Sequence, residues 1–96
     1  GYIYGTMSSI HQDFKEGYNN YFTIMFYLNK VWEPSYGGET IFLTDNQSEI
    51  FQAVLPKPGR ALIFDGYIPH GAREISRECI EFRMVVTFNY LLKNYV

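Results

Sequence analysis

Apolar residues in this chain occur in short runs, separated by clusters that are polar or contain Gly and Pro. Helical spacing with capping residues is absent, whereas turn clusters recur at short intervals, a pattern typical of strands. The runs predict strands over residues 7–14, 21–28, 39–43, 50–55, 60–64 and 80–90.

The apolar content of these runs predicts where they lie in the fold. Residues 21–28 (YFTIMFYL) are apolar almost throughout, which predicts a central strand buried on both faces. Residues 60–64 predict a short buried strand, and residues 80–90 (IEFRMVVTFNY) show the strongest strand pattern. Loops are expected over residues 15–20 and 29–38. About seven short strands without helices between them predict an all-β jelly roll of two facing antiparallel sheets.

Composition narrows the class of protein. The 96 residues suffice for one domain, residues 1–96, and the 47% hydrophobic and 19% aromatic content favours a strand-rich globular fold. A net charge of −2 with interspersed signs gives no electrostatic basis for binding nucleic acid or an anionic membrane. No apolar run approaches the ~20 residues of a membrane span. Cys79 is the one cysteine and forms no internal disulfide, which favours a reducing, cytoplasmic compartment.

The chain begins with Gly1 rather than an initiator Met and opens directly in a strand-like pattern. No basic segment followed by an apolar one marks a secretion signal. We therefore expect a core fragment of a longer protein that lacks N-terminal flanking elements.

A histidine and a carboxylate lie two positions apart in the first predicted strand. Side chains alternate faces on a strand, so His11 and Asp13 point to the same side. The one other histidine is His70, and a jelly roll can bring distant strand ends together at one mouth. Two histidines and one carboxylate leave metal positions open, as in non-haem Fe(II) oxygenases. An isolated His-x-Asp pair is common in proteins that bind no metal. The surrounding residues must therefore show whether this pair is a metal site.

One of those residues is a cation within an apolar stretch. Burying the Arg83 guanidinium costs desolvation free energy unless a carboxylate forms an ion pair with it. Internal candidates are Glu39, Glu78 and Glu81. Alternatively, Arg83 binds the carboxylate of a small dicarboxylate ligand, with Thr87 four residues on along the same strand face and the Tyr27 phenol as hydrogen-bond donors.

Four further residues have open roles. Asp65 either orients a ring nitrogen of His70 or lies in a surface turn. Trp32 either packs in its loop or lines a substrate mouth. The pair Gly37-Gly38 permits a turn or bulge before the next strand.

Ordered motifs across nearly the whole chain carry a resemblance to a known family. They are His11-x-Asp13, Tyr27-Leu28-Asn29-Lys30-x-Trp32, Gly37-Gly38-Glu39, Pro56-x-x-Gly59-Arg60, Phe64, His70 and Arg83-x-x-x-Thr87. In this order they resemble the Fe(II)/2-oxoglutarate-dependent oxygenases, and within these the prolyl-hydroxylase branch. So many ordered matches are far more specific than the two histidines and the aspartate alone. The fold of that family is a double-stranded β-helix, which agrees with the predicted jelly roll.

The resemblance implies a role for each matching residue. His11, Asp13 and His70 match the iron ligands. Arg83 matches the basic residue that pairs with the distal carboxylate of 2-oxoglutarate. Thr87 and Tyr27 match the family residues that hydrogen-bond to the same carboxylate. Tyr4 lies near a family tyrosine that lines the same pocket.

The resemblance also implies an activity for residues 1–96 as a catalytic core. The cofactors implied are Fe(II) and 2-oxoglutarate, and ascorbate is considered as a third. The implied reaction is hydroxylation of an unactivated C–H bond with release of succinate and carbon dioxide. The carboxylate at Asp13 favours hydroxylation over halogenation. The substrate is peptidyl or a small molecule, and nothing in the residues decides between them.

Two other functions stay open at this point. The first is a catalytically silent jelly-roll module that binds a metal or ligand without turnover. The second is a cupin-like enzyme that uses no 2-oxo acid. The cupin metal motif expects paired histidines and a downstream glutamate, whereas this chain has two histidines in all.

Overall fold

A computed structural model describes residues 10–79 and 82–93 of the chain. In these residues it contains six strands and one short 3-10 turn. They are β1 (Tyr18–Tyr27), η1 (Pro34–Tyr36), β2 (Thr40–Leu43), β3 (Ile50–Val54), β4 (Ala61–Asp65), β5 (His70–Ala72) and β6 (Val85–Lys93).

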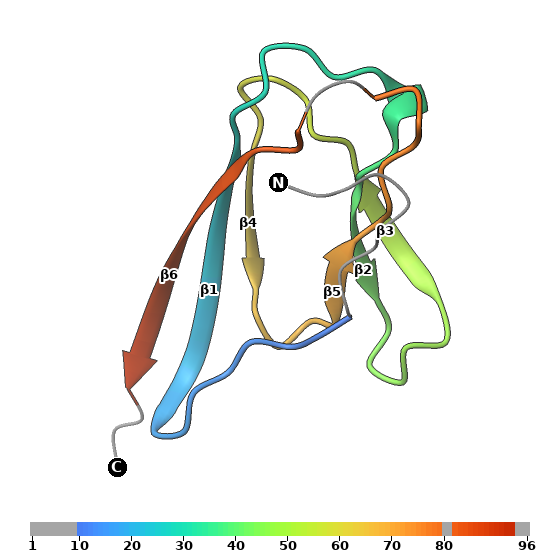
Figure 1. Ribbon diagram of the computed structural model, residues 1–96. Coiled ribbons are helices and arrows are strands. Elements are labelled where there is room, and N and C mark those ends of the chain that lie inside the picture. The colour runs from blue at the N-terminus through green and yellow to red at the C-terminus, as the bar shows by residue number, and fades with distance from the viewer. Residues whose placement is uncertain (1–9, 80–81, 94–96) are drawn as a thin grey trace.

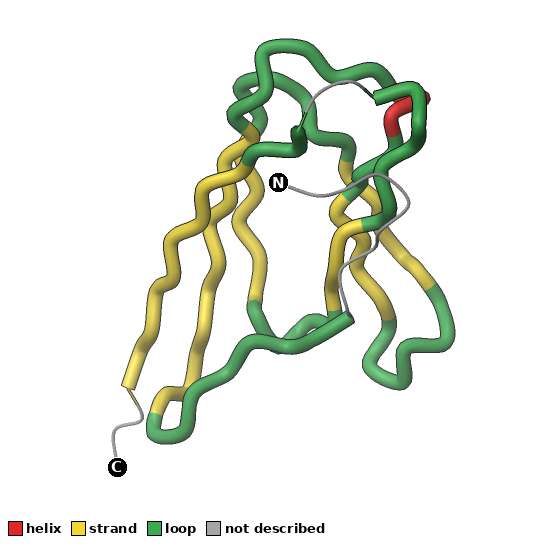
Figure 2. The backbone as a smooth tube through the Cα atoms, in the orientation of Figure 1, coloured by secondary structure: helices red, strands yellow, loops and turns green. Residues whose placement is uncertain are grey.

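The strands form two three-stranded antiparallel sheets that face one another (Figure 1). One sheet has the order β4-β1-β6 and the other has the order β3-β2-β5. Loops join the strands at both ends of the two sheets (Figure 2). The predicted all-β class with two facing antiparallel sheets is confirmed.

Strand β1 is the centre of its sheet, because it pairs with β6 along most of its length and with β4 over residues 22–26. Its side chains alternate, so that Thr23 and Tyr27 are buried towards the second sheet. Phe26 points to the outer face and is 39% exposed, beside Phe88 at 55% and Ile63 at 73%. The predictions that residues 21–28 are buried on both faces and that residues 60–64 form a buried strand are therefore wrong.

Strand β2 supplies the core on the opposite side, and all four of its residues are buried. The Phe42 ring packs edge-on against Phe64 of the first sheet, with centroids 5.0 Å apart. Phe64 also lies against the His70 ring, at 4.8 Å between centroids. An aromatic cluster thus fills part of the space between the sheets and supports one wall of the site described below.

The predicted first strand is wrong over its described part. Residues 7–9 lie outside the described residues, and within 10–14 only an isolated bridge from His11 to His70 is present. The chain then turns away from β5, because the Asp13 N–H donates to Gly66 O at 2.6 Å. Residues 10–14 consequently form a strap that bonds to His70 of β5 and to Gly66 in the loop between β4 and β5.

The last strand begins later than predicted, at Val85. The Asn29 side chain donates to Phe82 O at 2.6 Å and accepts from Met84 N–H at 2.8 Å. These bonds occupy backbone groups that a strand partner would use, so Arg83 precedes the strand instead of lying within it. Residues 80–81 lie outside the described residues.

Smaller differences concern other boundaries. Strand β1 begins at Tyr18, inside the predicted loop 15–20, and the loop 29–38 contains the turn η1. Strand β5 was not predicted, because three residues are too few to show a pattern.

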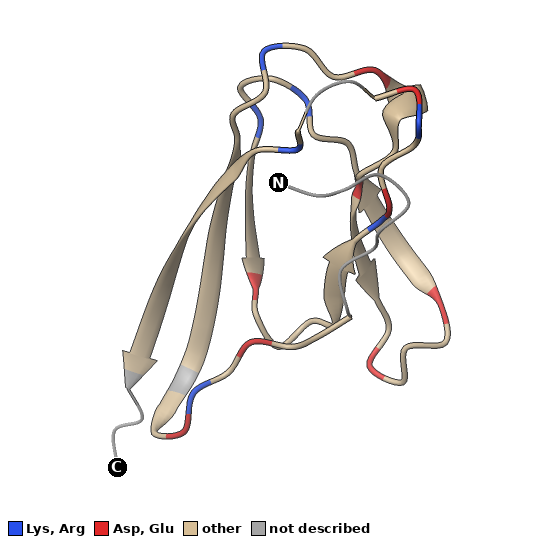
Figure 3. Ribbon diagram, in the orientation of Figure 1, with Lys and Arg blue, Asp and Glu red and all other residues tan. Residues whose placement is uncertain are grey.

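Charged residues lie mostly in loops and at strand ends, and both signs occur there (Figure 3). Among the described residues, no helix has the length and apolar character needed to cross a membrane.

Candidate functional site

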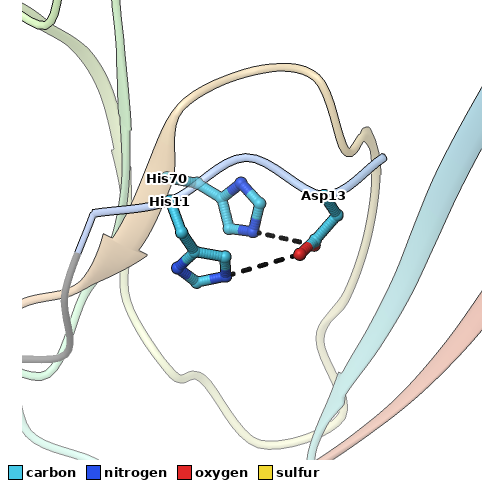
Figure 4. A group of neighbouring side chains, drawn as sticks. All are labelled: His11, Asp13 and His70. Atoms are coloured by element: carbon cyan, nitrogen blue, oxygen red, sulfur yellow. Dashed lines mark ion pairs between the residues drawn. The ribbon is translucent and has the colours of Figure 1, made fainter. Parts of the chain in front are cut away.

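Two imidazoles and one carboxylate meet at one end of the two sheets. The distance from His70 Nε2 to Asp13 Oδ2 is 3.3 Å, and that from His11 Nε2 to Asp13 Oδ1 is 3.7 Å. One ligand atom of each residue lies within 4.8 Å of the other two. Figure 4 shows the two rings and the carboxylate pointing towards one another. The structure therefore brings together the three residues that the sequence singled out.

The backbone explains this convergence. The His11 N–H donates to His70 O and the His70 N–H donates to His11 O, both at 2.9 Å. This pair of bonds fixes the strap to the edge of β5 and places the two rings 4.4 Å apart between centroids. The bond from the Asp13 N–H to Gly66 O then holds the backbone of Asp13 so that its carboxylate faces both rings.

One ring is further oriented by a carbonyl. His70 Nδ1 lies 2.7 Å from Ile68 O. A carbonyl can only accept, so Nδ1 carries the proton, and in the neutral imidazole this leaves the lone pair of Nε2, the nitrogen nearest Asp13, for a metal ion. The suggested role of Asp65 in orienting His70 is wrong, because its Oδ1 accepts from the Tyr67 N–H at 2.9 Å instead.

A cavity of about 310 Å³ lies between the two sheets beside these three residues. Side chains from both sheets line it, which is why distant parts of the sequence meet there. The first sheet contributes Tyr21, Thr23, Met25, Phe64, Val85, Thr87 and Asn89, and the second contributes Thr40, His70, Gly71 and Ala72. Arg83 completes the lining together with His11 and Asp13.

Arg83 is 3% exposed and turns into this cavity. Its Nε donates to Gly38 O at 2.8 Å, and its Nη2 donates to Thr40 Oγ1 at 3.0 Å. Of the carboxylates considered as its partners, Glu39 lies 3.8 Å from Arg73 Nε, and Glu81 lies outside the described residues.

The model of the 2OG-Fe(II) oxygenase superfamily matches residues 2–91. The chain belongs to this superfamily. The predicted family is confirmed, and its description implies Fe(II) and 2-oxoglutarate in general. No curated protein matches the chain.

Among solved structures, this superfamily member is similar to the crystal structure of a Pseudomonas putida prolyl-4-hydroxylase. The TM-score is 0.70 at 23% sequence identity, over 98% of this chain and 48% of that one. The chain therefore spans about half the length of that structure. The likeness shows the fold, so the predicted double-stranded β-helix of the prolyl-hydroxylase type is confirmed.

The donor atoms of the triad suit the ferrous ion that the superfamily uses. Metal bonds of about 2.1 Å place ligands on neighbouring corners of an octahedron about 3 Å apart. The 3.3 Å and 3.7 Å separations, each to a different Asp13 oxygen, come near this value. With one donor atom taken from each residue, the three atoms lie within 4.8 Å of one another. Two imidazole nitrogens with one carboxylate oxygen are also the ligand types that non-haem Fe(II) prefers.

The tyrosine predicted to help Arg83 lies behind the cavity wall. Tyr27 is 3% exposed, and its hydroxyl lies 2.5 Å from Thr40 Oγ1. Arg83 Cζ lies 5.6 Å from the centroid of the Tyr27 ring. Burial raises the pKa of the Tyr27 phenol, although the hydrogen bond to Thr40 and the charge of Arg83 partly oppose this effect. Thr87 lines the cavity as expected, and Tyr4 lies outside the described residues.

Sequence reasoning missed several residues of the cavity wall. Thr40 is 2% exposed and joins Arg83 to Tyr27, and a hydroxyl in the apolar run of β2 was the available signal. Thr23 is 4% exposed and donates to Asn89 Oδ1 at 3.3 Å. Both residues occupy strand positions whose side chains face the other sheet. Once the strand register is known, the alternation of side chains therefore identifies both as residues that line the cavity.

Proposed function

We propose that this chain is the catalytic core of an Fe(II)- and 2-oxoglutarate-dependent dioxygenase that hydroxylates an unactivated C–H bond. One observation carries the proposal. A His-Asp-His triad and a buried arginine line the same cavity between the two sheets. Metal-binding and carboxylate-binding chemistry therefore adjoin one another, as a 2-oxo dicarboxylate requires.

In this proposal His11, Asp13 and His70 hold the ferrous ion. When bound, the ion supplies positions for the 2-oxo acid and for dioxygen, because three protein ligands leave coordination sites open. Ile68 O holds the His70 ring in the tautomer whose Nε2 can bind a metal. The bond from the Asp13 N–H to Gly66 O keeps the Asp13 carboxylate facing both imidazoles.

Arg83 binds the distal carboxylate of 2-oxoglutarate from its buried position. Its guanidinium is always charged and suits a carboxylate geometrically. The cavity of about 310 Å³ lies at the small end of ligand pockets, in keeping with a small dicarboxylate. Thr87 lines the same wall and supplies a second hydroxyl.

Counting protons assigns the direct hydroxyl donor to Thr40. Arg83 only donates, so it occupies a lone pair of Thr40 Oγ1. Tyr27 and Thr40 hold two hydroxyl protons and use one of them between themselves. Either hydroxyl could donate in that bond, and we assign the donor role to Tyr27, because Thr40 lines the cavity and its own proton can then face the ligand. In the structure this hydroxyl faces Met25 Sδ, a weak acceptor, at 3.8 Å.

The overall reaction consumes dioxygen, 2-oxoglutarate and the substrate C–H bond. One oxygen atom enters succinate, the other enters the product hydroxyl, and carbon dioxide leaves. The fold shared with a prolyl-4-hydroxylase favours a peptidyl substrate over a small molecule. Ascorbate stays a prediction as a third cofactor.

The test measures succinate release from 2-oxoglutarate with added Fe(II), with and without candidate substrates such as proline-containing peptides. His70→Ala should abolish release, because it removes a metal ligand. Arg83→Ala should raise the 2-oxoglutarate requirement while leaving metal binding intact. Full activity in His70→Ala would contradict the proposal. Binding of metal and 2-oxoglutarate without succinate release would instead indicate a catalytically silent binding module.

A further inference from the structure

We propose that Trp32 is a positioning residue that orients Arg83 through the Gly37–Gly38 turn. The inference rests on the proposed function, in which Arg83 binds the distal carboxylate of 2-oxoglutarate. Trp32 does not line the cavity, so any effect on that ligand must pass through other residues.

The first step links Trp32 to the turn. Its Nε1–H donates to Gly37 O at 3.0 Å. Its ring also covers the next residue, since a Cβ built on Gly38 would lie 2.9 Å from Trp32 Cζ2. Both glycines have positive φ, +72° and +71°, a conformation that glycine adopts at least cost. The indole therefore fixes both the orientation of the Gly37 peptide and the position of Gly38.

The second step links the turn to the arginine. Gly38 O accepts the hydrogen bond from Arg83 Nε at 2.8 Å. A Cβ on Gly38 would also lie 3.4 Å from Arg83 Cδ, so the arginine stem lies close against the turn. On the other side of the turn, the Gly38 N–H donates to Glu74 O at 3.1 Å.

The orientation of the Arg83 guanidinium decides whether it can bind the ligand. A guanidinium is planar, and its bonds to a carboxylate form only when the plane is correctly rotated. The bonds from Nε to Gly38 O and from Nη2 to Thr40 Oγ1 fix that plane. Removing the indole donor frees the Gly37 peptide, which lets the acceptor at Gly38 move and the guanidinium rotate.

The test compares Trp32→Phe with Tyr36→Phe. Trp32→Phe keeps an aromatic ring but removes the donor to Gly37. Tyr36→Phe is the matched control, because its ring still contacts Trp32 edge-on at 5.4 Å between centroids. Mn(II) replaces Fe(II) so that 2-oxoglutarate is not turned over. Calorimetry on the Mn(II)-loaded protein should then show 2-oxoglutarate affinity about tenfold weaker in Trp32→Phe than in the unsubstituted protein. Mn(II) affinity should not change, and Tyr36→Phe should match the unsubstituted protein.

A double-substitution cycle separates positioning from general destabilisation. Arg83→Lys lacks the donor to Gly38 but keeps a positive charge, so it should bind 2-oxoglutarate more weakly. Adding Trp32→Phe to Arg83→Lys should then have no further effect, whereas a merely structural role predicts additive losses. Additive losses, an equal loss of Mn(II) affinity or unchanged 2-oxoglutarate affinity in Trp32→Phe would each overturn the inference.

The remaining outcomes are also decisive. If the unsubstituted protein binds no 2-oxoglutarate, the proposed function fails and this inference fails with it. If it binds and Trp32→Phe binds equally well, only the inference fails. Trp32→Tyr serves as a second variant, and loss of the fold in both variants would show that Trp32 is structural only.

Discussion

Gly66 lies directly against Asp13. A Cβ built on Gly66 would lie 2.8 Å from both Asp13 Cβ and Asp13 O, and 2.9 Å from Tyr21 Cδ1. The Gly66 N–H donates to Tyr21 O, and Gly66 O accepts from the Asp13 N–H, both at 2.6 Å. A glycine therefore allows the strap that carries the carboxylate to approach the first sheet.

Gly66→Ala should weaken metal binding at least tenfold, because the added methyl group displaces the Asp13 backbone and its carboxylate. Titration with Mn(II) or Co(II) would measure the effect. Gly17→Ala is a useful control, because φ is +89° there but nothing lies within 4 Å of the added Cβ. That variant should lose folding stability through backbone strain without losing metal affinity. Equal metal affinity in Gly66→Ala would show that the contact with Asp13 is unimportant for the site.

Metal binding should also stabilise the fold. The ligands come from the strap and from β5, so an ion would connect segments that two backbone bonds now join. At a metal concentration of 100 times the dissociation constant, linkage gives about 2.7 kcal/mol of stabilisation. For a domain of this size the melting temperature should rise by roughly 10 to 20 °C and fall again with a chelator. Thermal unfolding of His11→Ala should show no such rise.

The sequence pattern located most of the fold. Apolar runs predicted β1 to β4 within a few residues, because β-branched and aromatic residues favour strands. The start of β6 could not be found in this way, since it depends on the bonds of the distant Asn29 side chain. Outer-face exposure at Ile63 was missed as well, because an apolar run does not reveal which face is covered.

The candidate site was only partly accessible from sequence. Residue types and order singled out His11, Asp13, His70 and Arg83, whose chemistry is distinctive. The strap geometry could not be foreseen, because it depends on the close approach of Gly66 to Asp13. Sequence reasoning gave Tyr27 as a hydrogen-bonding partner of the ligand, and this stays a prediction. In the structure the Tyr27 hydroxyl contacts Thr40 Oγ1, and Thr40 rather than Tyr27 lines the cavity.

Thr40→Val should weaken 2-oxoglutarate binding about tenfold while preserving shape. It removes a hydroxyl that accepts from Arg83 and contacts Tyr27, and it leaves those buried donors unsatisfied. Calorimetry on Mn(II)-loaded protein would measure the loss. Thr23→Val is the matched control, because Thr23 lines the cavity but bonds to Asn89 instead of the arginine group. Equal losses in both variants would contradict the special role of Thr40.

Tyr27 should ionise at higher pH than a tyrosine of the unfolded chain, because burial raises its pKa from the ordinary value of 10.0. At neutral pH its phenol is therefore protonated and can donate to Thr40. Below about pH 10 the phenol holds its proton in both the folded and the unfolded chain, so it adds no pH dependence. At higher pH the unfolded chain loses this proton first, and the free energy of unfolding falls.

Tyrosinate absorbance of the folded protein should show one step above the range seen in denaturant, and Tyr27→Phe should lack it. The fall in unfolding free energy above pH 10 should also be shallower in Tyr27→Phe. A Tyr27→Phe titration identical to that of the unsubstituted protein would show that the buried phenol is not the late-ionising group. In that case proton donation from Tyr27 to Thr40 would lose its support.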